Sequence, residues 1–304
     1  MNHSNLINSL SSLVSEEQNP DTLDIDQLST LEVVKKINQQ DECVSLAIKE
    51  ILPALAESVD LIVTAFRNGG RLIYQGAGTS GRLGVLDAVE CVPTFSVDEG
   101  LIVGLMAGGE SAMFKAKEGI EDKESEGVND LKAINLNDKD VLVGIAASGR
   151  TPYVIGGLKY ANQIGAKTIA LSCNGNAEIA RYAQISLLPI VGPEVLAGST
   201  RLKSGSAQKM VLNILSTASM IRIGKSYKNL MVDLRATNKK LVARGTRMIM
   251  QVTGVEQSIA EETLALADNQ VKLALVMILK GVTAKDAKEL LSDSDGFLAK
   301  VLNT

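Results

Sequence analysis

The stretch RLIYQGAGTSG at residues 71–81 decides the fold. RLIYQ is short and rich in strand-forming residues, GAGTSG is a glycine-rich turn, and the LGVLDAVE that follows has the apolar spacing of a helix. A strand, a tight turn and a helix in this order form one unit of an α/β sheet. The unit recurs from residue 140, where DVLVGI and the turn AASGRT precede a helical segment with Pro152 in its first turn.

Four more segments have the composition of strands, and helical segments lie among them. We predict these strands at 94–97 (TFSV), 101–106 (LIVGLM), 167–173 (KTIALSC) and 185–191 (ISLLPIV). Strands that alternate with helices predict an α/β fold, in which a parallel sheet of about five strands is covered by helices on both faces.

Helical periodicity flanks the sheet at both ends of the chain. It predicts helices over 29–66 and 111–134, and a long apolar helix that ends near residue 224. The pattern divides the chain into an N-terminal segment with helices (1–60), a sheet domain (61–226) and a helical C-terminal region (227–304), with a small bundle at 255–304.

The composition excludes several classes of protein. The 304 residues contain 31 Lys and Arg against 35 Asp and Glu, a net charge of −4, and a single histidine, His3. One histidine near the N-terminus cannot supply a Ser-His-Asp or Cys-His catalytic system or a histidine-rich zinc site, so we predict no bound metal. The acidic balance and the absence of Trp argue against nucleic acid as a partner.

The sequence also bears on the compartment. Cys43, Cys91 and Cys173 are odd in number and far apart, which indicates reduced thiols rather than a disulfide framework. The N-terminus lacks the features of a signal peptide, and no run of about 18 apolar residues occurs. We therefore predict a cytoplasmic protein that has no membrane partner.

Three hydroxyl-rich turns follow predicted strands. They contain Gly78, Thr79 and Ser80 in the first turn, Ser148, Gly149 and Thr151 in the second, and Ser199 and Thr200 in the third. GAGTSG matches the G-x-G-x-x-G pattern of dinucleotide sites, and Asp98-Glu99 stands where a ribose ligand is expected. A dinucleotide turn does not need hydroxyls, however, whereas backbone N–H and hydroxyl groups together suit a phosphomonoester. The alternative is that each Ser or Thr only caps a helix.

Three longer motifs resemble one family. GAGTSGRLG, AASGRTPYV and above all GPEVLAGSTRLKSGSAQKM are similar to segments of the N-acetylmuramic acid 6-phosphate etherases, and the resemblance runs from NPDTLDID near residue 19 to the end. The glucokinase regulatory protein is related and shares the third motif. The resemblance implies the sugar-isomerase (SIS) fold, a homodimer whose neighbouring subunit is a candidate to complete the site, and a C-terminal helical module of the ubiquitin-associated type.

The resemblance also implies a reaction. The substrate is a 6-phosphosugar that carries a D-lactyl ether at C3. A base removes the proton at C2, an acid protonates the ether oxygen, lactate leaves, and water adds at C3. No metal or other cofactor takes part, and the role is the recycling of peptidoglycan amino sugars.

Two glutamates match the family's catalytic positions. Glu90, in DAVECVPT, is implied as the general acid, and Glu121, in KEGIED, as the general base. A carboxylic acid that stays protonated near neutral pH needs an apolar setting, and the neighbours of Glu90 in sequence are apolar. Glu118, one helical turn before Glu121, remains an alternative base.

Three charged residues surround the third turn. Arg201 and Lys203 are candidate partners of a phosphate, and Glu194 is a candidate partner of a sugar hydroxyl. A salt bridge among them is an equally good interpretation of the same pattern.

Three other functions remain open from the residues. A non-catalytic sensor of sugar phosphates would need the hydroxyl turns but not the two glutamates. A 6-phosphosugar isomerase of the same fold would release no acid. An NAD-dependent dehydrogenase would bind nicotinamide, although no histidine is available as its proton shuttle.

Overall fold

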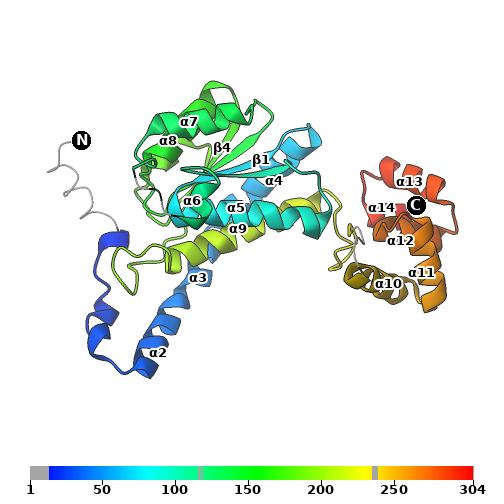
Figure 1. Cartoon of the computed structure of the whole chain (residues 1–304), viewed down its shortest axis with the longest axis horizontal. Coiled ribbons are helices and arrows are strands. Elements are labelled where there is room, and N and C mark those ends of the chain that lie inside the picture. The colour runs from blue at the N-terminus through cyan, green and yellow to red at the C-terminus, as the bar shows by residue number, and fades with distance from the viewer. Residues whose placement is uncertain (1–13, 116, 118, 235–238, 304) are drawn as a thin grey trace. The chain divides into compact units, whose positions relative to one another are not determined.

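A computed structural model describes residues 14–115, 117, 119–234 and 239–303 (Figure 1). The chain folds into two compact units, and each is described by itself. The first contains residues 1–89 and 100–215, and the second contains 90–99 and 216–304. The domain boundaries expected from the sequence stay a prediction.

The first unit is built on a five-stranded parallel sheet. Its strands are β1 (Leu72–Gly76), β2 (Ile102–Met106), β3 (Val141–Ile145), β4 (Lys167–Leu171) and β5 (Ile185–Leu187). They lie in the order β2-β1-β3-β4-β5, and every neighbouring pair is parallel. All residues of β1 and β3 are buried, as expected for a sheet covered on both faces. The predicted fold class is confirmed.

Helices precede, connect and follow these strands. They are α2 (Thr30–Asp41), α3 (Cys43–Lys49), α4 (Leu52–Arg67), α5 (Gly78–Phe95), α6 (Ser111–Phe114), α7 (Glu124–Ala133), α8 (Pro152–Gln163), the 3-10 helix η4 (Glu178–Tyr182) and α9 (Lys203–Arg222). The helix predicted over 29–66 is interrupted between α3 and α4, where Pro53 fits only the first turn of a new helix. The helix predicted over 111–134 is wrong, because Gly119 has a left-handed φ of 78° and a turn follows it.

Residues 94–97 do not form the predicted strand. Thr94 and Phe95 are the last residues of α5, which also contains Pro93. Ala88, Cys91 and Phe95 are buried at a spacing of three and four residues, so one stripe of α5 packs into the core. This packing overrides the local preference of TFSV for a strand.

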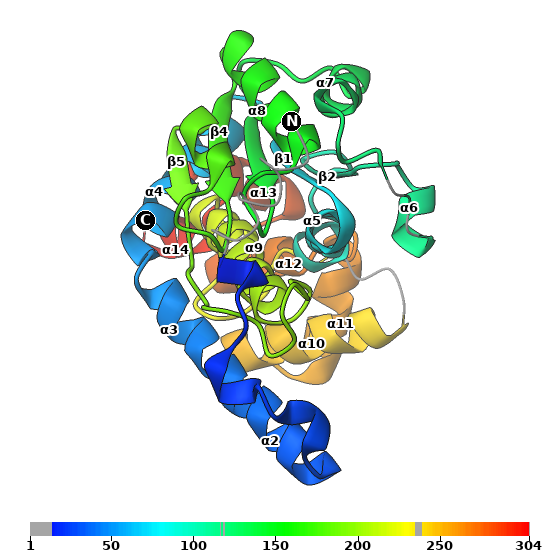
Figure 2. The same ribbon diagram turned by 90° about the vertical axis from the view of Figure 1, so that its left-hand side faces the viewer.

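Side chains of β1 alternate between the two faces of the sheet. The Tyr74 hydroxyl donates a hydrogen bond to Oδ2 of Asp87 on α5, at 3.1 Å. Gln75 points to the opposite face, where its Nε2 donates to the carbonyl oxygen of Gly127 on α7, at 2.8 Å. The helices α7 and α8 lie side by side on this second face (Figure 2).

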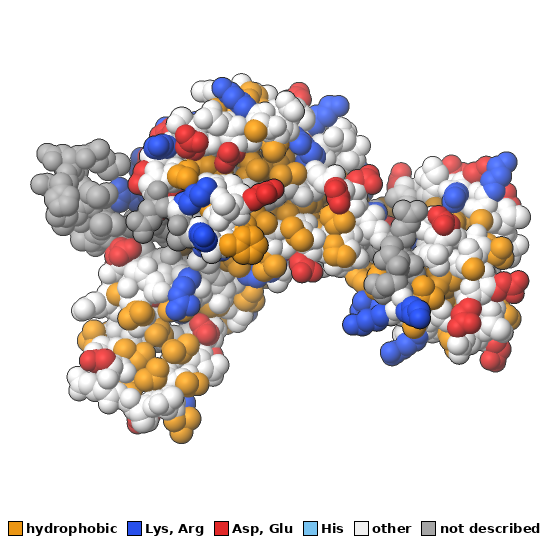
Figure 3. All heavy atoms as spheres, in the orientation of Figure 1, with side chains coloured by type: hydrophobic (Ala, Val, Ile, Leu, Met, Phe, Trp, Pro, Cys, Tyr) orange, Lys and Arg blue, Asp and Glu red, His pale blue; other side chains and the backbone are white. Residues whose placement is uncertain are grey.

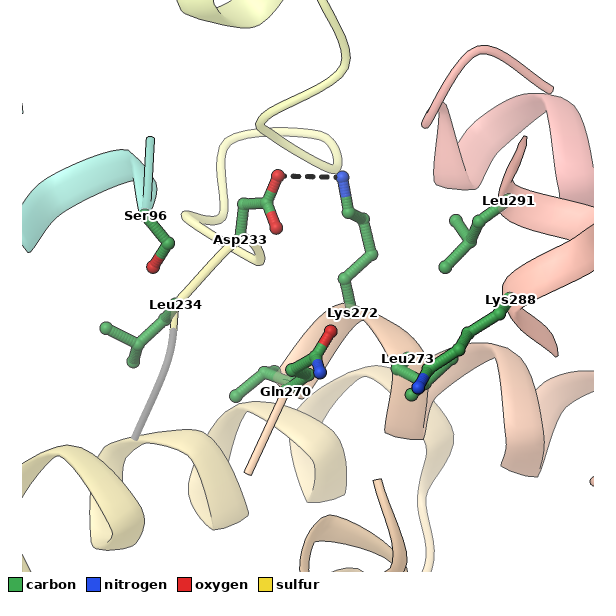
Figure 4. A pocket seen from close by; sticks show the side chains of 9 residues that line it. Ser96, Asp233, Leu234, Gln270, Lys272, Leu273, Lys288 and Leu291 are labelled. Carbon is green, nitrogen blue, oxygen red and sulfur yellow. Dashed lines mark hydrogen bonds and ion pairs between the residues drawn. The ribbon is translucent and has the colours of Figure 1, made fainter. Parts of the chain in front are cut away.

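The second unit contains five complete helices within the described residues, together with the last residues of α5 and α9. The complete helices are α10 (Lys239–Thr253), α11 (Gln257–Leu266), α12 (Val271–Lys280), α13 (Ala284–Asp293) and α14 (Leu298–Asn303). Their shared core also includes Val232 and Leu234 from the non-helical segment before α10. Lys272 fixes this segment through an ion pair with Asp233, at 2.9 Å (Figure 4).

We find no helix among the described residues that is both long and apolar enough to span a bilayer.

We expect Gly127→Ala to destabilise the first unit, because α7 and α8 leave no room for a Cβ atom there. That Cβ would lie 1.9 Å from the carbonyl oxygen of Tyr153, and backbone cannot rotate away as a flexible side chain can. Overpacking of this kind costs about 1–3 kcal/mol of unfolding free energy. Urea unfolding measures the loss. Gly205→Ala in α9 is the matched control, because its Cβ would make ordinary contacts at 3.6 Å; an equal loss in both variants would contradict the packing argument.

Candidate active site

The strand order creates a crevice at the carboxyl edge of the sheet. β1 and β3 are neighbours, but the chain leaves β1 for α5 on one face and leaves β3 for α8 on the other. Ligands of open α/β sheets bind where the connections diverge in this way. A cavity of about 450 Å³ lies there. Its lining comprises Glu16, Ala77, Gly78, Thr79, Ser80, Glu121, Asp122, Ala146, Ala147, Ser148, Arg150, Thr151, Pro152, Gly198 and Thr200.

The first hydroxyl-rich turn becomes the start of α5. Gly78 has a φ of 54°, and the turn returns so closely that a Cβ on Gly81 would lie 2.6 Å from the carbonyl oxygen of Gly76. The first N–H groups of a helix have no acceptor in a preceding turn, and they carry partial positive charge. Gly78, Thr79 and Ser80 line the cavity at this helix start, and their binding of an anion stays a prediction.

The second turn contributes Ser148 and Thr151. Gly149 between them has a φ of 73°, and a Cβ there would lie 2.3 Å from the Cβ of Ala177. Gly149 shapes the turn but is not among the described lining residues. Thr151 occupies the N-cap position of α8, yet its side chain makes no capping hydrogen bond. For Thr151 the helix-cap alternative is therefore not supported.

The third turn is held by the N-terminal segment. The N–H of Gly198 donates to the carbonyl oxygen of Ser15, at 2.8 Å. This contact brings Glu16 and Thr200 to the same cavity. Ser199, adjacent to both Gly198 and Thr200, is not among the lining residues that the structure describes, so its role in binding stays a prediction.

Glu194 and Lys203 occupy a buried position behind the third turn. The two carboxylate oxygens of Glu194 accept the N–H groups of Lys203 and Ser204, each at 2.9 Å, at the start of α9. A carboxylate at a helix N-terminus is favourable. The Lys203 ammonium donates to Oε1 of Gln40 on α2, at 2.9 Å. These contacts are structural, and the described lining of the cavity does not include Glu194, Arg201 or Lys203.

Glu121 lies in the turn that leads into α7. The N–H of Tyr153, in the first turn of α8, donates to the carbonyl oxygen of Glu121 at 3.0 Å. The side chain of Glu121 lines the cavity beside Asp122 and is exposed to solvent. Glu118, the alternative base, lies outside the described residues.

Glu90 lies far along α5 from the cavity end. It is exposed, and about three helical turns, roughly 18 Å of rise, separate it from Gly78. The sequence predicts that apolar neighbours surround the Glu90 carboxyl group, and within a single chain they do not. Val89 is 62% exposed, and Cys91 is buried on another face of the helix. Figure 3 shows hydrophobic side chains on the surface over α5, and Leu86 and Val89 belong to the exposed set.

Sequence reasoning missed three charged residues of the cavity. Arg150 stands inside the quoted turn AASGRT, so its position beside Ser148 and Thr151 was available as a signal. The sequence contains no signal for Glu16, because only the contact between Ser15 and Gly198 brings the N-terminal segment to the site. Asp122 adjoins Glu121 in the same turn.

Comparison with known proteins decides the family. The N-acetylmuramic acid 6-phosphate etherase of Vibrio atlanticus (strain LGP32) is 61% identical over 302 residues, which are 99% of this chain and 99% of that protein. The N-acetylmuramic acid 6-phosphate etherase 2 of Vibrio cholerae serotype O1 is 59% identical over 302 residues, 99% and 98% of the two chains. The chain belongs to the N-acetylmuramic acid 6-phosphate etherase family.

Two domain models agree with membership of this etherase family. The N-terminal SIS domain of glucokinase regulatory protein matches residues 54–162, and the SIS domain matches 123–218. The predicted SIS fold is thus confirmed. Among solved structures, a phosphoheptose isomerase from Francisella tularensis is similar with a TM-score of 0.48 and 16% identity, covering 64% of this chain and 100% of that chain.

Gln208 on α9 supports the first hydroxyl turn. Ser80 Oγ lies 2.9 Å from Oε1 of Gln208, and both residues are buried. Nε2 of Gln208 has no hydrogen-bond partner among the residues that the structure describes. If the amide is turned over, Nε2 donates to Ser80 Oγ, and the Ser80 hydroxyl proton becomes available to an anion in the cavity.

We expect Gln208→Glu to weaken binding of a 6-phosphosugar about tenfold, because a carboxylate can only accept the Ser80 proton and it adds negative charge. Gln208→Met has similar length without polar atoms and leaves the Ser80 proton free, so its effect is smaller. The measurement is KM and kcat for each variant, with thermal unfolding as the folding control. Equal KM values in two folded variants would contradict this role of Gln208.

Proposed function

We propose that the protein cleaves the D-lactyl ether of N-acetylmuramic acid 6-phosphate with water, giving N-acetylglucosamine 6-phosphate and D-lactate. The observation that carries this proposal is the position of Glu121 at the rim of a cavity lined by hydroxyl groups and the start of α5. Full-length identity of about 60% to named etherases supports the substrate. The free cysteines Cys43, Cys91 and Cys173 agree with a cytoplasmic location.

Each part of the cavity has a role in this reaction. The N–H groups at the start of α5 and the hydroxyls of Thr79, Ser80, Ser148 and Thr151 bind the phosphate, which fixes the sugar. In the open-chain sugar the C1 aldehyde acidifies the proton at C2, and the Glu121 carboxylate removes it. Electrons move to form the C2–C3 double bond while the C3–O bond breaks and lactate leaves. Water then adds across this double bond, with its oxygen at C3 and a proton returned to C2.

The departing ether oxygen needs a proton, and Glu90 is the proposed donor. Glu90 and the start of α5 are separated by the length of the helix, so one chain does not bring Glu90 to its own cavity. The exposed Leu86 and Val89 beside Glu90 form an apolar surface that a second copy would cover. We therefore propose a homodimer in which each subunit supplies Glu90 to the site of the other.

D-lactate release from N-acetylmuramic acid 6-phosphate tests the reaction, without added metal or cofactor. Wild type should release lactate, and Glu90→Gln and Glu121→Gln should each lose at least about a hundredfold in kcat, the usual contribution of a general acid or base. Glu99→Gln, an exposed glutamate after α5, is the control and should retain activity. A folded wild type that converts the sugar phosphate without releasing lactate would be an isomerase, and one that only binds it would be a sensor.

Mixing the two inactive variants tests the shared site. In a heterodimer of Glu90→Gln and Glu121→Gln subunits, one of the two sites contains both native glutamates. After subunit exchange at equal concentrations we expect roughly a quarter of wild-type activity, since half of the dimers are mixed. If lactate release stays absent although exchange is shown by a mass tag, the two glutamates act within one chain.

A further inference from the structure

A hollow of about 320 Å³ in the second unit has no part in the proposed reaction. Residues from α10 and from the segment before it form its lining: Asn229, Leu230, Met231, Arg244, Arg247, Met248 and Gln251. Two guanidinium groups and two amides meet here above apolar side chains. None of these residues belongs to the cavity at the sheet.

The helix α10 carries an unbalanced charge. Lys239, Lys240, Arg244 and Arg247 are all exposed, and the segment Lys239–Thr253 contains no Asp or Glu. Lys240 and Arg244 are four residues apart and Arg244 and Arg247 are three apart, so like charges are neighbours on the helix surface, which is unfavourable. No carboxylate within the described residues forms an ion pair with any of the four. Figure 3 shows Lys and Arg side chains gathered over α10.

Another hollow of the same unit provides a contrast (Figure 4). One of its two cations, Lys272, pairs with Asp233 and also donates to the carbonyl oxygens of Gly224 and Gly296, at 3.1 and 3.0 Å. Lys272 is therefore used in holding the fold together. Arg244 and Arg247 have no comparable acceptors in the part of the chain that the structure describes.

We propose that Arg244 and Arg247 form a second anion site, which binds a small phosphomonoester. Two guanidinium groups match a phosphate because each can donate two parallel hydrogen bonds to it, and a dianion offsets the repulsion along α10. The amides of Asn229 and Gln251 supply further donors. The volume suits a small ligand, and Met231 and Met248 adapt to the carbon skeleton of an ester.

Calorimetric titration of the full-length protein tests this site, with inorganic phosphate and glucose 6-phosphate as probes. The triple variant Thr79→Val/Ser148→Ala/Thr151→Val serves as the background, because it weakens phosphate binding in the cavity at the sheet. We expect this background still to bind one phosphate per chain, and Arg244→Gln/Arg247→Gln added to it to weaken that binding at least about tenfold. Raised salt should also weaken the binding. Lys285→Gln/Lys288→Gln in α13 removes the same charge from the same unit and should leave the affinity unchanged.

The outcomes separate this site from the reaction. In the otherwise native protein, Arg244→Gln/Arg247→Gln should keep lactate release and lose only the second bound phosphate. Arg244→Lys/Arg247→Lys should bind this phosphate with intermediate affinity, because lysine keeps the positive charge but lacks the two parallel N–H donors of a guanidinium group. Equal phosphate affinity with and without the two arginines would overturn the proposal. An equal loss of phosphate affinity in Lys285→Gln/Lys288→Gln would also overturn it. Binding of a poly-glutamate peptide but of neither phosphate probe would instead assign the hollow to an acidic protein partner.

Discussion

The close approach of α7 and α8 to the centre of the sheet is the constraint on which the site depends. A Cβ atom on Gly157 would lie 1.7 Å from Oε1 of Gln75, and one on Gly156 would lie 2.2 Å from the carbonyl oxygen of Glu124. A side chain at either glycine would push these elements apart. The close packing that glycine allows lets the turn before α7 reach the first turn of α8. The hydrogen bond from the Tyr153 N–H to the Glu121 carbonyl oxygen then holds the proposed base at the carboxyl edge of the sheet. Packing deep in the fold thus positions a group at the surface.

Below that turn, a hydrogen-bond network ties the same helices together. The Tyr153 hydroxyl donates to Oδ2 of Asp130 on α7, at 2.5 Å. Burial and the neighbouring carboxylate raise the pKa of Tyr153 far above its usual range, so it remains a neutral donor at any physiological pH. Burial is also the main cause of a raised pKa at Asp130, against which the Tyr153 hydrogen bond acts. Tyr153 therefore ties the first turn of α8 to α7, next to the turn that contains the proposed base.

The sequence predicts those parts of the site that local order determines. A glycine-rich turn between a strand and a helix places Thr79 and Ser80 beside Ser148 and Thr151, because the carboxyl ends of β1 and β3 are adjacent. Parts that depend on tertiary contacts were not predictable in the same way. TFSV joins a helix because Phe95 continues a buried stripe, and Glu194 is buried at the start of α9 instead of lining the cavity. Glu16 reaches the cavity only through the contact of Ser15 with Gly198.

In the proposed homodimer, α5 would serve two sites. The start of α5 presents N–H groups and hydroxyls to the cavity of its own chain, whereas Glu90 lies near the other end with Leu86 and Val89 exposed beside it. A rigid helix cannot bring both ends to one small substrate, so the proposed pair of glutamates would require either a large rearrangement of α5 or a second chain. Unwinding α5 would expose Ala88, Cys91 and Phe95, which are buried, and would cost their hydrophobic stabilisation. Association through the exposed Leu86 and Val89 would instead bury apolar surface, and this difference in cost is the physical argument for the proposed homodimer.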